Sequence, residues 1–519
     1  MADRRRRRRL GRVRRLGTAR GRRIPNPLRT RLALLGCALA LPCVALLSNG
    51  LVFGVGDQDI AAVFVQEAVG GELFAGDLLA GAAARHPSLL WALVGALRAL
   101  VPAEALSHIG VLLSLVSCGL ALGLIGRELA PETPRAWVLG AMAAGAAQLV
   151  LGGAPTLDPL LVPRLVALPV ELFALLAAVR QRWHVAFLLA GLALCVHAPS
   201  AAALSVGMGV GWVPRRHEAR AAPLLALLGA GLALSLAGGQ LAPMGVDGPS
   251  WRLIEARLAH HLVPNSWPLA TWVAAAAWSA VAAWALRRSG AGGTLMLVLA
   301  GLLGWALLAG VLGPVLEVRL LLNLEPWQAL RFVVLLASVA VPCAMPATRV
   351  GAVLAAAWVA LCVGVSPRSS RLGPAERDVI ALAKWASKHS EPGDLFVLPP
   401  NLPPAFRERA QRPVYALWKD GGEAQFDPLL GKEWAERMTR LCACSPFDDL
   451  PPEHAPFGRS RTLASAVGAA YDSRPREELV GVAKAAGAAW LVTRAAGDGV
   501  AVGPFWVVEV PRKPTEEVR

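Results

Sequence analysis

Charged residues are scarce in this chain, and lysine is missing from most of it. Only 17% of the 519 residues are charged, whereas 55% are hydrophobic and the mean hydropathy is +0.50. This composition excludes a soluble globular protein of such length and indicates that a lipid bilayer is the main solvent. The first lysine is Lys384, and both tyrosines, Tyr415 and Tyr471, lie beyond it. A boundary is therefore predicted near residues 366–373, where the composition changes.

The signatures of common soluble enzymes are also missing. The sequence has no Gly-rich phosphate-binding loop, no Ser, His and Asp in the order of a hydrolase triad, and no zinc-binding spacing of Cys and His. Six of the eight cysteines lie in apolar runs, where Cys behaves as a small hydrophobic residue. Ionisable residues are rare in these runs, with Glu171 as the main exception, which disfavours an ion-coupled transporter.

The N-terminal arm, residues 1–31, is strongly basic. It holds fourteen arginines and one acid, Asp3, and the apolar run that follows, 32–55, has only Ser48 and Asn49 as polar side chains. Because arginines beside an apolar span resist translocation, we expect a cytoplasmic N-terminus and an uncleaved membrane anchor. The arm is interpreted as a topology signal that rests on anionic membrane lipid. No aromatic residue interleaves the arginines, so nucleic acid is not expected as a partner.

Apolar runs of membrane-spanning character recur through residues 32–370. About eleven are predicted, at 32–55, 107–126, 136–152, 161–179, 184–197, 199–213, 221–238, 269–286, 293–315, 329–346 and 350–366. The odd number places the C-terminal part on the side opposite the arm, and the arginine content of the loops agrees with this. Merging 184–213 into one helix would reverse the topology. The prediction is a bacterial inner-membrane protein whose C-terminal part is periplasmic.

Residues 371–519 are predicted to form a soluble α/β domain. Helices are expected from Pro374 and around 431–444, 462–470 and 475–486, and strands at 395–398, 414–418, 489–492 and 506–510. About 150 residues can bury a core of their own. The predicted fold class is a polytopic α-helical membrane protein with a C-terminal soluble α/β domain.

Carboxylates concentrate in the first predicted outer loop, residues 54–86. Asp57 and Asp59 directly follow the first span, and Asp77 closes the sequence Glu72-Leu-Phe-Ala-Gly-Asp77. At the outer edge of a membrane, such side chains can supply a general base for an acceptor hydroxyl, and Asp57 and Asp59 could converge on one hydroxyl or divalent metal ion. The alternative is a solvated loop in which the acids cap helices.

Basic residues near the outer face are candidates for substrate binding. Arg164 and Arg331 lie near the predicted outer ends of spans, where a lipid phosphate would sit, and Arg suits bidentate phosphate contacts. Snorkelling anchors are the alternative. Arg257 and His260 belong to an amphipathic stretch in the outer loop 239–268, which could cover a site as a lid or lie flat on the membrane.

A second basic group lies in the predicted outer domain. It follows the proline-rich turn 399–404, at the carboxyl end of a predicted strand, where open α/β sheets place ligands. A pocket for a glycan or phosphate and a solvated helix face are both compatible with it. The group comprises Arg407, Arg409, Arg412 and Lys419.

Taken together, these features resemble the GT-C glycosyltransferases, membrane enzymes that use polyprenyl-phosphate or polyprenyl-diphosphate sugars. The shared features are a first span, an acidic first periplasmic loop, about eleven spans and a periplasmic α/β domain. In that superfamily an aspartate or glutamate of the first loop is the catalytic base, and Asp57 and Asp59 occupy that place here. The resemblance implies transfer of a sugar from a polyprenyl-phosphate carrier to a glycan, lipid or protein acceptor.

A closer resemblance is to an uncharacterised group of bacterial polytopic membrane proteins with GT-C-like architecture. It rests on short motifs at 73–77, 196–199, 325–331 and 396–400, with Phe406, Arg407, Lys419, Glu433 and Trp434. The sequence Asp57-Gln58-Asp59 is not the adjacent acidic pair of protein O-mannosyltransferases, so the identity of the base stays open between these two residues. A non-catalytic scaffold or a transporter is the alternative function.

Overall fold

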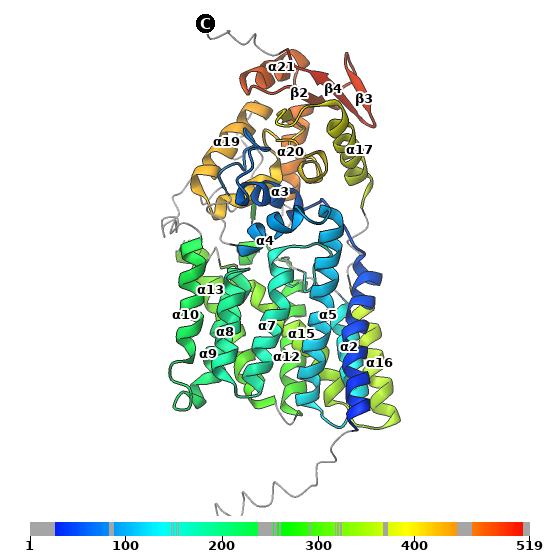
Figure 1. Ribbon diagram of the computed structural model, residues 1–519, viewed down its shortest axis with the longest axis vertical. Helices are drawn as coiled ribbons and strands as arrows, with labels where there is room; N and C mark the ends of the chain where they lie inside the picture. The colour runs from blue at the N-terminus through cyan, green and yellow to red at the C-terminus, as the bar shows by residue number, and fades with distance from the viewer. Residues whose placement is uncertain are drawn as a thin grey trace, which may run out of the picture.

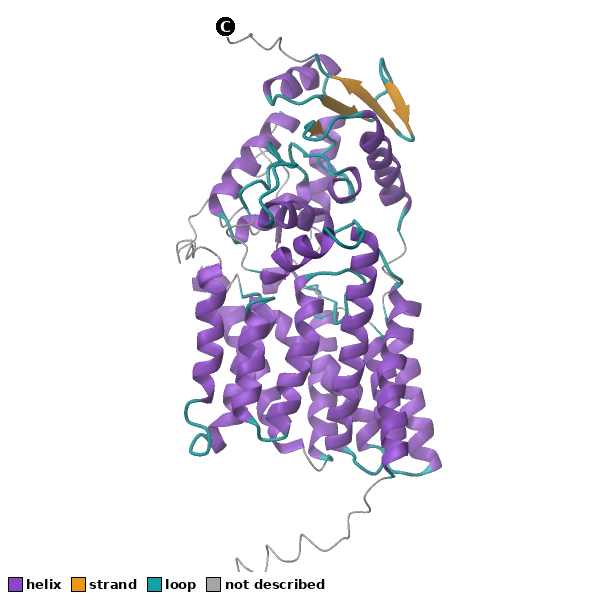
Figure 2. Cartoon of the chain, viewed as in Figure 1, coloured by secondary structure: helices purple, strands orange, loops and turns teal. Residues whose placement is uncertain are grey.

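The protein consists of a bundle of roughly parallel and antiparallel helices, with a smaller mixed helix and strand region at one end (Figure 1). The computed structural model describes residues 26–82, 88–146, 148, 150, 151, 153, 155–236, 253, 257, 258, 261–289, 292–316, 318, 321, 324–366, 372–443 and 459–511. Most of residues 1–31 and the candidate His260 lie outside these ranges. The described chain is mostly helical, with one small sheet near its C-terminus (Figure 2).

Five helical segments are long and apolar enough to cross a membrane. They are α2 (Pro27–Asn49), α5 (Ala103–Leu129), α12 (Leu269–Arg287), α13 (Gly292–Leu316) and the segment Pro326–Ala344, which contains α15 (Ala329–Ala344). The other predicted runs are shorter helices, namely α6 (Pro134–Gly145), α7 (Pro163–Val179), α8 (Trp183–Leu194), α9 (Ala198–Trp212), α10 (Ala222–Leu236) and α16 (Arg349–Gly364). The chain is thus a helical, membrane-associated protein.

The stretch 184–213 forms two helices, α8 and α9, and not one long helix. Pro199 lies in the first turn of α9, where its missing N–H costs nothing but where it prevents a continuous helix from running through. The His197 ring nitrogen Nδ1 accepts a hydrogen bond from the Ser200 backbone N–H at 3.4 Å and caps the new helix. The alternative of one long helix over 184–213 is therefore wrong.

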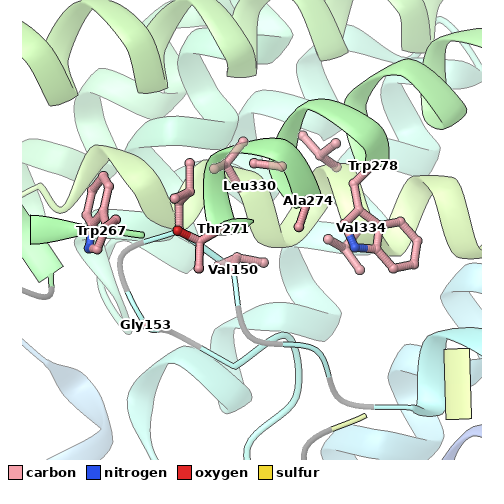
Figure 3. Close-up of a pocket in the computed structure, with 11 residues that line it drawn as sticks. Val150, Gly153, Trp267, Thr271, Ala274, Trp278, Leu330 and Val334 are labelled. Carbon is pink, nitrogen blue, oxygen red and sulfur yellow. The ribbon is translucent and has the colours of Figure 1, made fainter. Parts of the chain in front are cut away.

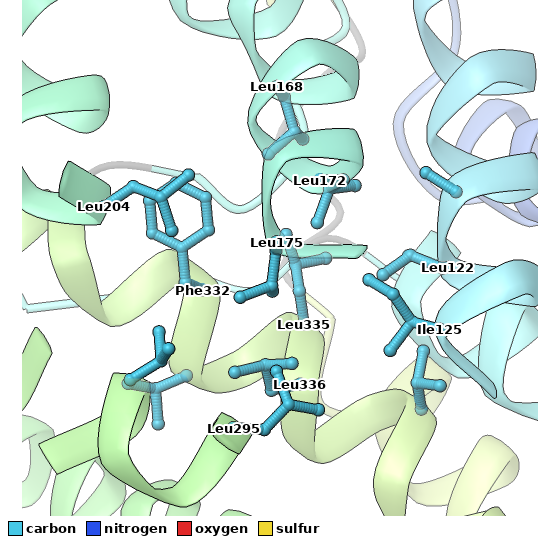
Figure 4. Close-up of a cluster of buried hydrophobic side chains, with 14 of the residues drawn as sticks. Leu122, Ile125, Leu168, Leu172, Leu175, Leu204, Leu295, Phe332, Leu335 and Leu336 are labelled. Carbon is cyan, nitrogen blue, oxygen red and sulfur yellow. The ribbon is translucent and has the colours of Figure 1, made fainter. Parts of the chain in front are cut away.

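The bundle packs around α15, which is buried along almost its whole length. Its Phe332, Leu335 and Leu336 meet leucines from α5, α7, α9 and α13 (Figure 4). In contrast, α12 exposes most of its apolar surface, as a helix in contact with lipid would. Small residues let helices approach closely, as at Gly191 of α8 and Gly229 of α10.

The C-terminal part is a four-stranded sheet covered by helices on both faces. The strands β1 (Phe396–Val397), β2 (Trp490–Thr493), β3 (Val500–Val502) and β4 (Phe505–Glu509) have the order β1-β2-β4-β3, with β1 parallel to β2 and the other pairs antiparallel. Phe396 packs with α17 (Pro374–His389), whereas its neighbour Val397 packs in a second core. This alternation follows from the pleat. The second core contains α19 (Pro428–Cys442), α20 (Arg459–Asp472) and α21 (Arg476–Ala485).

One strand prediction differs from the structure, and one strand of the structure was not predicted. Residues 414–418 contribute only one bridge, between Val414 and Phe396, because the chain then turns into the 3-10 helix η5 (Trp418–Gln425). The edge strand β3 was not predicted, since its residues are largely exposed and form no apolar run. It pairs with β4 across a turn that contains Gly503 at φ +59°.

The segment that follows α2 folds against the C-terminal part. This segment contains α3 (Asp57–Ala68) and α4 (Leu89–Arg98), and α3 contacts α18 (Arg407–Ala410). Gly54 has φ +65°, and a Cβ atom there would lie 3.0 Å from Arg409 Cγ, so only glycine permits this approach. Leu78 lies in the same core as α19 and β2. The first loop and the C-terminal part therefore share a core.

Candidate functional site

The Asp57 carboxylate lies where three parts of the chain meet. It belongs to the first turn of α3, and its Oδ1 is 2.9 Å from Nζ of Lys419 in η5. Its Oδ2 is 3.2 Å from Nη2 of Arg164, which lies in the first turn of α7. The side chains of Asp57, Lys419 and Arg164 are 38%, 32% and 23% exposed. The first loop, the bundle and the C-terminal part thus contribute one charged group each to a solvent-accessible centre, called here the Asp57 centre.

Arg164 is fixed by a second, buried carboxylate. Its Nε and Nη2 donate to the two carboxylate oxygens of Asp158, each at 2.8 Å. Asp158 is almost fully buried. A bidentate pair of this kind holds the guanidinium plane in one orientation. Arg164 therefore presents a fixed positive charge to Asp57.

Arg331 is buried inside the bundle, although its sequence position predicted an accessible side chain near the end of a span. Its side chain is fully buried in α15, and its Nη2 donates to the backbone carbonyl of Arg164 at 3.1 Å. It therefore positions the start of α7 and is not itself exposed to a ligand. Glu171, on α7, is also fully buried and accepts a hydrogen bond from the Ser200 hydroxyl.

The surroundings of Asp57 and Glu423 shift the pKa values of these two carboxyl groups in opposite directions. The Lys419 ammonium, followed by the Arg164 guanidinium, holds the pKa of Asp57 well below its usual range, so Asp57 is ionised at neutral pH. Glu423 lies one turn after Lys419 in η5. Burial and then the charge of Asp57 raise the pKa of Glu423 to about 8. Pairs of acids with separated pKa values are typical of acid and base roles.

Asp59 and Asp77 belong to a different group, called here the Arg407 clasp, which also contains Asp420. Arg407 Nε donates to Asp77 Oδ2 at 2.7 Å, and its two terminal nitrogens donate to Asp420 at 2.9 and 2.8 Å. Asp59 Oδ2 is 3.9 Å from Arg407 Nη1, and all four side chains are fully buried. The clasp joins the first loop to the C-terminal part, which is a structural role.

The expectation that Asp57 and Asp59 converge on one hydroxyl or metal ion is wrong. Residues two apart on a helix face different sides, so Asp57 points to Lys419 and Arg164 while Asp59 points to Arg407. Across the described ranges, no group of three or more His, Cys, Asp and Glu side chains is placed to hold a metal ion.

The clasp predicts a specific pH dependence of stability. It sets three buried carboxylates against one guanidinium, and burial raises the pKa of Asp59 to about 7 although Arg407 opposes the shift. In the unfolded chain this side chain ionises near pH 3.9. Between these values the native state keeps a proton that the unfolded state releases, so the contribution of Asp59 to stability is largest below about pH 4 and is lost as the pH rises to about 7.

We expect Asp59→Asn to remove this decline, which is on the order of 2–4 kcal/mol. The measurement is the unfolding midpoint of the detergent-purified protein between pH 4 and 7.5. Asp498→Asn, at an exposed position in the turn before β3, is the matched control and should keep the parent slope. An unchanged slope in Asp59→Asn would show that Asp59 is ionised in the fold.

Arg257 contacts the C-terminal part next to the Asp57 centre. Its Nε donates to the Trp418 carbonyl at 2.9 Å and its Nη2 to the Lys419 carbonyl at 3.3 Å. The side chain is buried, and burial lowers its pKa to about 10. Leu253 packs in the core with α19. Leu253 and Arg257 therefore both contact the C-terminal region.

An apolar cavity of about 110 Å³ opens between α12, α15 and the loop around residue 150 (Figure 3). Trp267, Trp278, Leu330 and Val334 line it, and Thr271 is its polar exception. Trp267 also contacts Trp327, with ring centroids 4.9 Å apart. Leu330 immediately precedes Arg331, so the same turn of α15 contributes to the cavity and supports Arg164.

The fold and this centre define a helical, membrane-associated protein with a charged junction under a C-terminal α/β region. Residues 377–441 match a family described as Domain of unknown function (DUF6798). No curated protein matches the chain. The matched segment includes Lys419 of the Asp57 centre, Arg407 and Asp420 of the clasp, and Glu423.

Sequence reasoning did not single out Asp158 or Glu423. Asp158 precedes a proline in a loop, where an acid is ordinary, and nothing in the sequence pairs it with Arg164. Glu423 had one available signal, its spacing of four from Lys419. Lys419 was considered as a binding residue in a basic pocket with Arg407, whereas the structure places Arg407 in the clasp.

Proposed function

We propose that the chain is a glycosyltransferase-like enzyme of the bacterial inner membrane that transfers a sugar from a polyprenyl-phosphate carrier to a periplasmic acceptor. The acceptor would be a glycan, a lipid or a protein. The observation that supports this most is the Asp57 centre, an accessible carboxylate held between two cations at one end of an apolar bundle. The apolar cavity, whose Leu330 precedes the Arg331 that contacts the Arg164 backbone, suits part of an isoprenoid chain.

In this proposal, Arg164 and Lys419 bind the phosphate that links sugar and carrier. The acceptor oxygen attacks the anomeric carbon, the bond from that carbon to the phosphate oxygen breaks, and polyprenyl phosphate leaves. Asp57 takes the proton of the acceptor hydroxyl as general base. The two cations stabilise the charge that develops on the leaving phosphate. Arg331 acts indirectly, through the backbone of Arg164.

The test is transfer of labelled sugar from polyprenyl-phosphate donors by membranes that contain the full chain. A panel of donor sugars is assayed against membranes that contain Asp57→Asn, and label in an acceptor only with the parent chain supports the proposal. The alternative is a non-catalytic scaffold or a transporter of unknown substrate. The double ion pairing of Asp57 favours that alternative, because a carboxylate so strongly ionised is a weak base as it stands. Absence of transfer from every donor, with normal protein level, would support it.

We further propose that all eleven bundle helices cross the membrane, with a cytoplasmic N-terminus and a periplasmic C-terminal domain. Alkaline phosphatase fused after Arg519 should then be active, because this enzyme matures only outside the cytoplasm. The matched control is the same fusion after Glu132, in the loop between α5 and α6, which should be inactive. The reverse pair of results would overturn this topology and move the Asp57 centre to the cytoplasm.

A further inference from the structure

Asp57 forms ion pairs with both Arg164 and Lys419, although the proposed chemistry needs a carboxylate that can accept a proton. Each of its oxygens is committed to a different cation, Oδ1 to Lys419 and Oδ2 to Arg164. These contacts hold the pKa of Asp57 far below that of an effective base at neutral pH. Something must therefore separate the carboxylate from its cations before it can act.

The two cations are already placed as an anion site. They come from separate parts of the fold, yet both lie within 3.2 Å of one carboxylate group. Arg164 cannot turn away, because Asp158 fixes its guanidinium. A phosphate monoester or diester group offers more oxygens than a carboxylate and suits the paired donors of Arg. Such a group can contact Lys419 and Arg164 in the same way that Asp57 does.

Partial exposure makes the exchange possible. Asp57 is 38% exposed, whereas Asp158 is 2% exposed. An incoming anion therefore reaches the contacts of Asp57 and not those of Asp158. Ion pairs between partly exposed groups are weaker than buried pairs such as that of Arg164 with Asp158. Displacement of Asp57 consequently costs little compared with binding of a phosphate by two cations.

We propose that Asp57 is an exchangeable counter-ion that occupies, in the free protein, a phosphate site formed by Arg164 and Lys419, and that the donor's phosphate displaces it. This inference rests on the glycosyltransferase function proposed above. It adds that the donor's phosphate binds before Asp57 can act as the base. Phosphate binding neutralises the two cations and frees the carboxylate. The base thus becomes effective only after the donor is bound, and Lys419 contributes the C-terminal domain's part of the site.

The test measures anion binding without any transfer reaction. Farnesyl phosphate, which carries no sugar, is titrated into the full-length protein in detergent, and inorganic phosphate is titrated in parallel. Removing the competing carboxylate with Asp57→Asn should tighten farnesyl phosphate binding about three- to tenfold. Lys419→Ala should weaken it about tenfold or more. Lys432→Ala, at an exposed position of α19, is the control and should bind like the parent.

Comparing farnesyl phosphate with inorganic phosphate shows whether the site binds a lipid-linked phosphate or free phosphate. Comparable binding of inorganic phosphate would assign the site to free phosphate and overturn its assignment to a lipid carrier, whereas preference for the prenyl ester supports it. Asp57→Ser serves as a second variant if the Asn variant does not fold, with the same expected direction. Unchanged or weaker binding in both variants overturns the exchange, even if the parent transfers sugar. Tighter binding in a protein that transfers no sugar supports the exchange and overturns the glycosyltransferase function.

Discussion

Replacement of Arg407 by methionine should lower the free energy of unfolding by about 3–5 kcal/mol, the largest stability loss expected for a single side chain here. Methionine fills most of the volume of Arg but leaves the buried carboxylates of Asp77 and Asp420 without their cation. The cost arises from those uncompensated charges and from lost hydrogen bonds, and not from a cavity. The unfolding midpoint of the purified protein measures the loss, and protease sensitivity should rise in both the first loop and the C-terminal region.

Arg440→Met is the matched control for this experiment. Arg440 is 65% exposed and its nearest carboxylate oxygen, on Glu436, is 4.0 Å away, so its loss should change stability by no more than about 0.5 kcal/mol. Adding Asp77→Asn and Asp420→Asn to Arg407→Met should recover part of the loss, because amides remain neutral when buried. If Arg407→Met were as stable as the control, the clasp would not be the tie between the two regions.

Replacement of Asp57 by asparagine should reduce sugar transfer on the order of a hundredfold to ten-thousandfold, the usual contribution of a general base. The amide keeps the shape of the carboxylate and removes the proton acceptor. Because Asp57 is partly exposed and outside the buried clasp, membrane insertion and protein level should stay the same. Initial rates of label transfer in membranes, normalised to protein level, measure the effect.

Asp77→Asn distinguishes a lost base from a lost fold. It removes the charge that Arg407 binds at 2.7 Å, so it should reduce stability and activity together. Asp57→Asn should reduce activity alone. If the Asp57 variant complemented a deletion strain as well as the parent, the glycosyltransferase function would fail and the scaffold or transporter would take its place.

The helices of the bundle could be predicted from the sequence, because a bilayer leaves few alternatives to a helix for an apolar segment. Apolar backbone in lipid must satisfy its hydrogen bonds within the segment, so a long apolar run predicts a helix without knowledge of its neighbours. The separation of α8 from α9 was harder, since it depends on Pro199 and on the cap by His197. The edge strand β3 is stabilised by pairing with β4, and its own sequence pattern does not predict this pairing.

The candidate site was predicted less completely, because burial decides the role of each acid. Asp57 and Asp59 are two residues apart and look equivalent in sequence, yet one is accessible and the other has no exposed surface. The difference is set by Arg407, which is 348 residues beyond Asp59. Arg331 was predicted to face a lipid headgroup as a helix-end arginine. Its burial follows from the central place of α15 in the bundle, which a single sequence does not reveal.

The clasp also fixes an order of events during synthesis. Asp77 leaves the ribosome 330 residues before the arginine that binds it. At roughly 5–20 residues per second, the first loop waits on the order of 20–60 seconds for its partner. During that interval its carboxylates are hydrated and ionised, and the bundle helices between them are inserted one after another. The clasp can therefore form only after the bundle helices have been synthesised, and a chain truncated before Arg407 would lack the partner of Asp77.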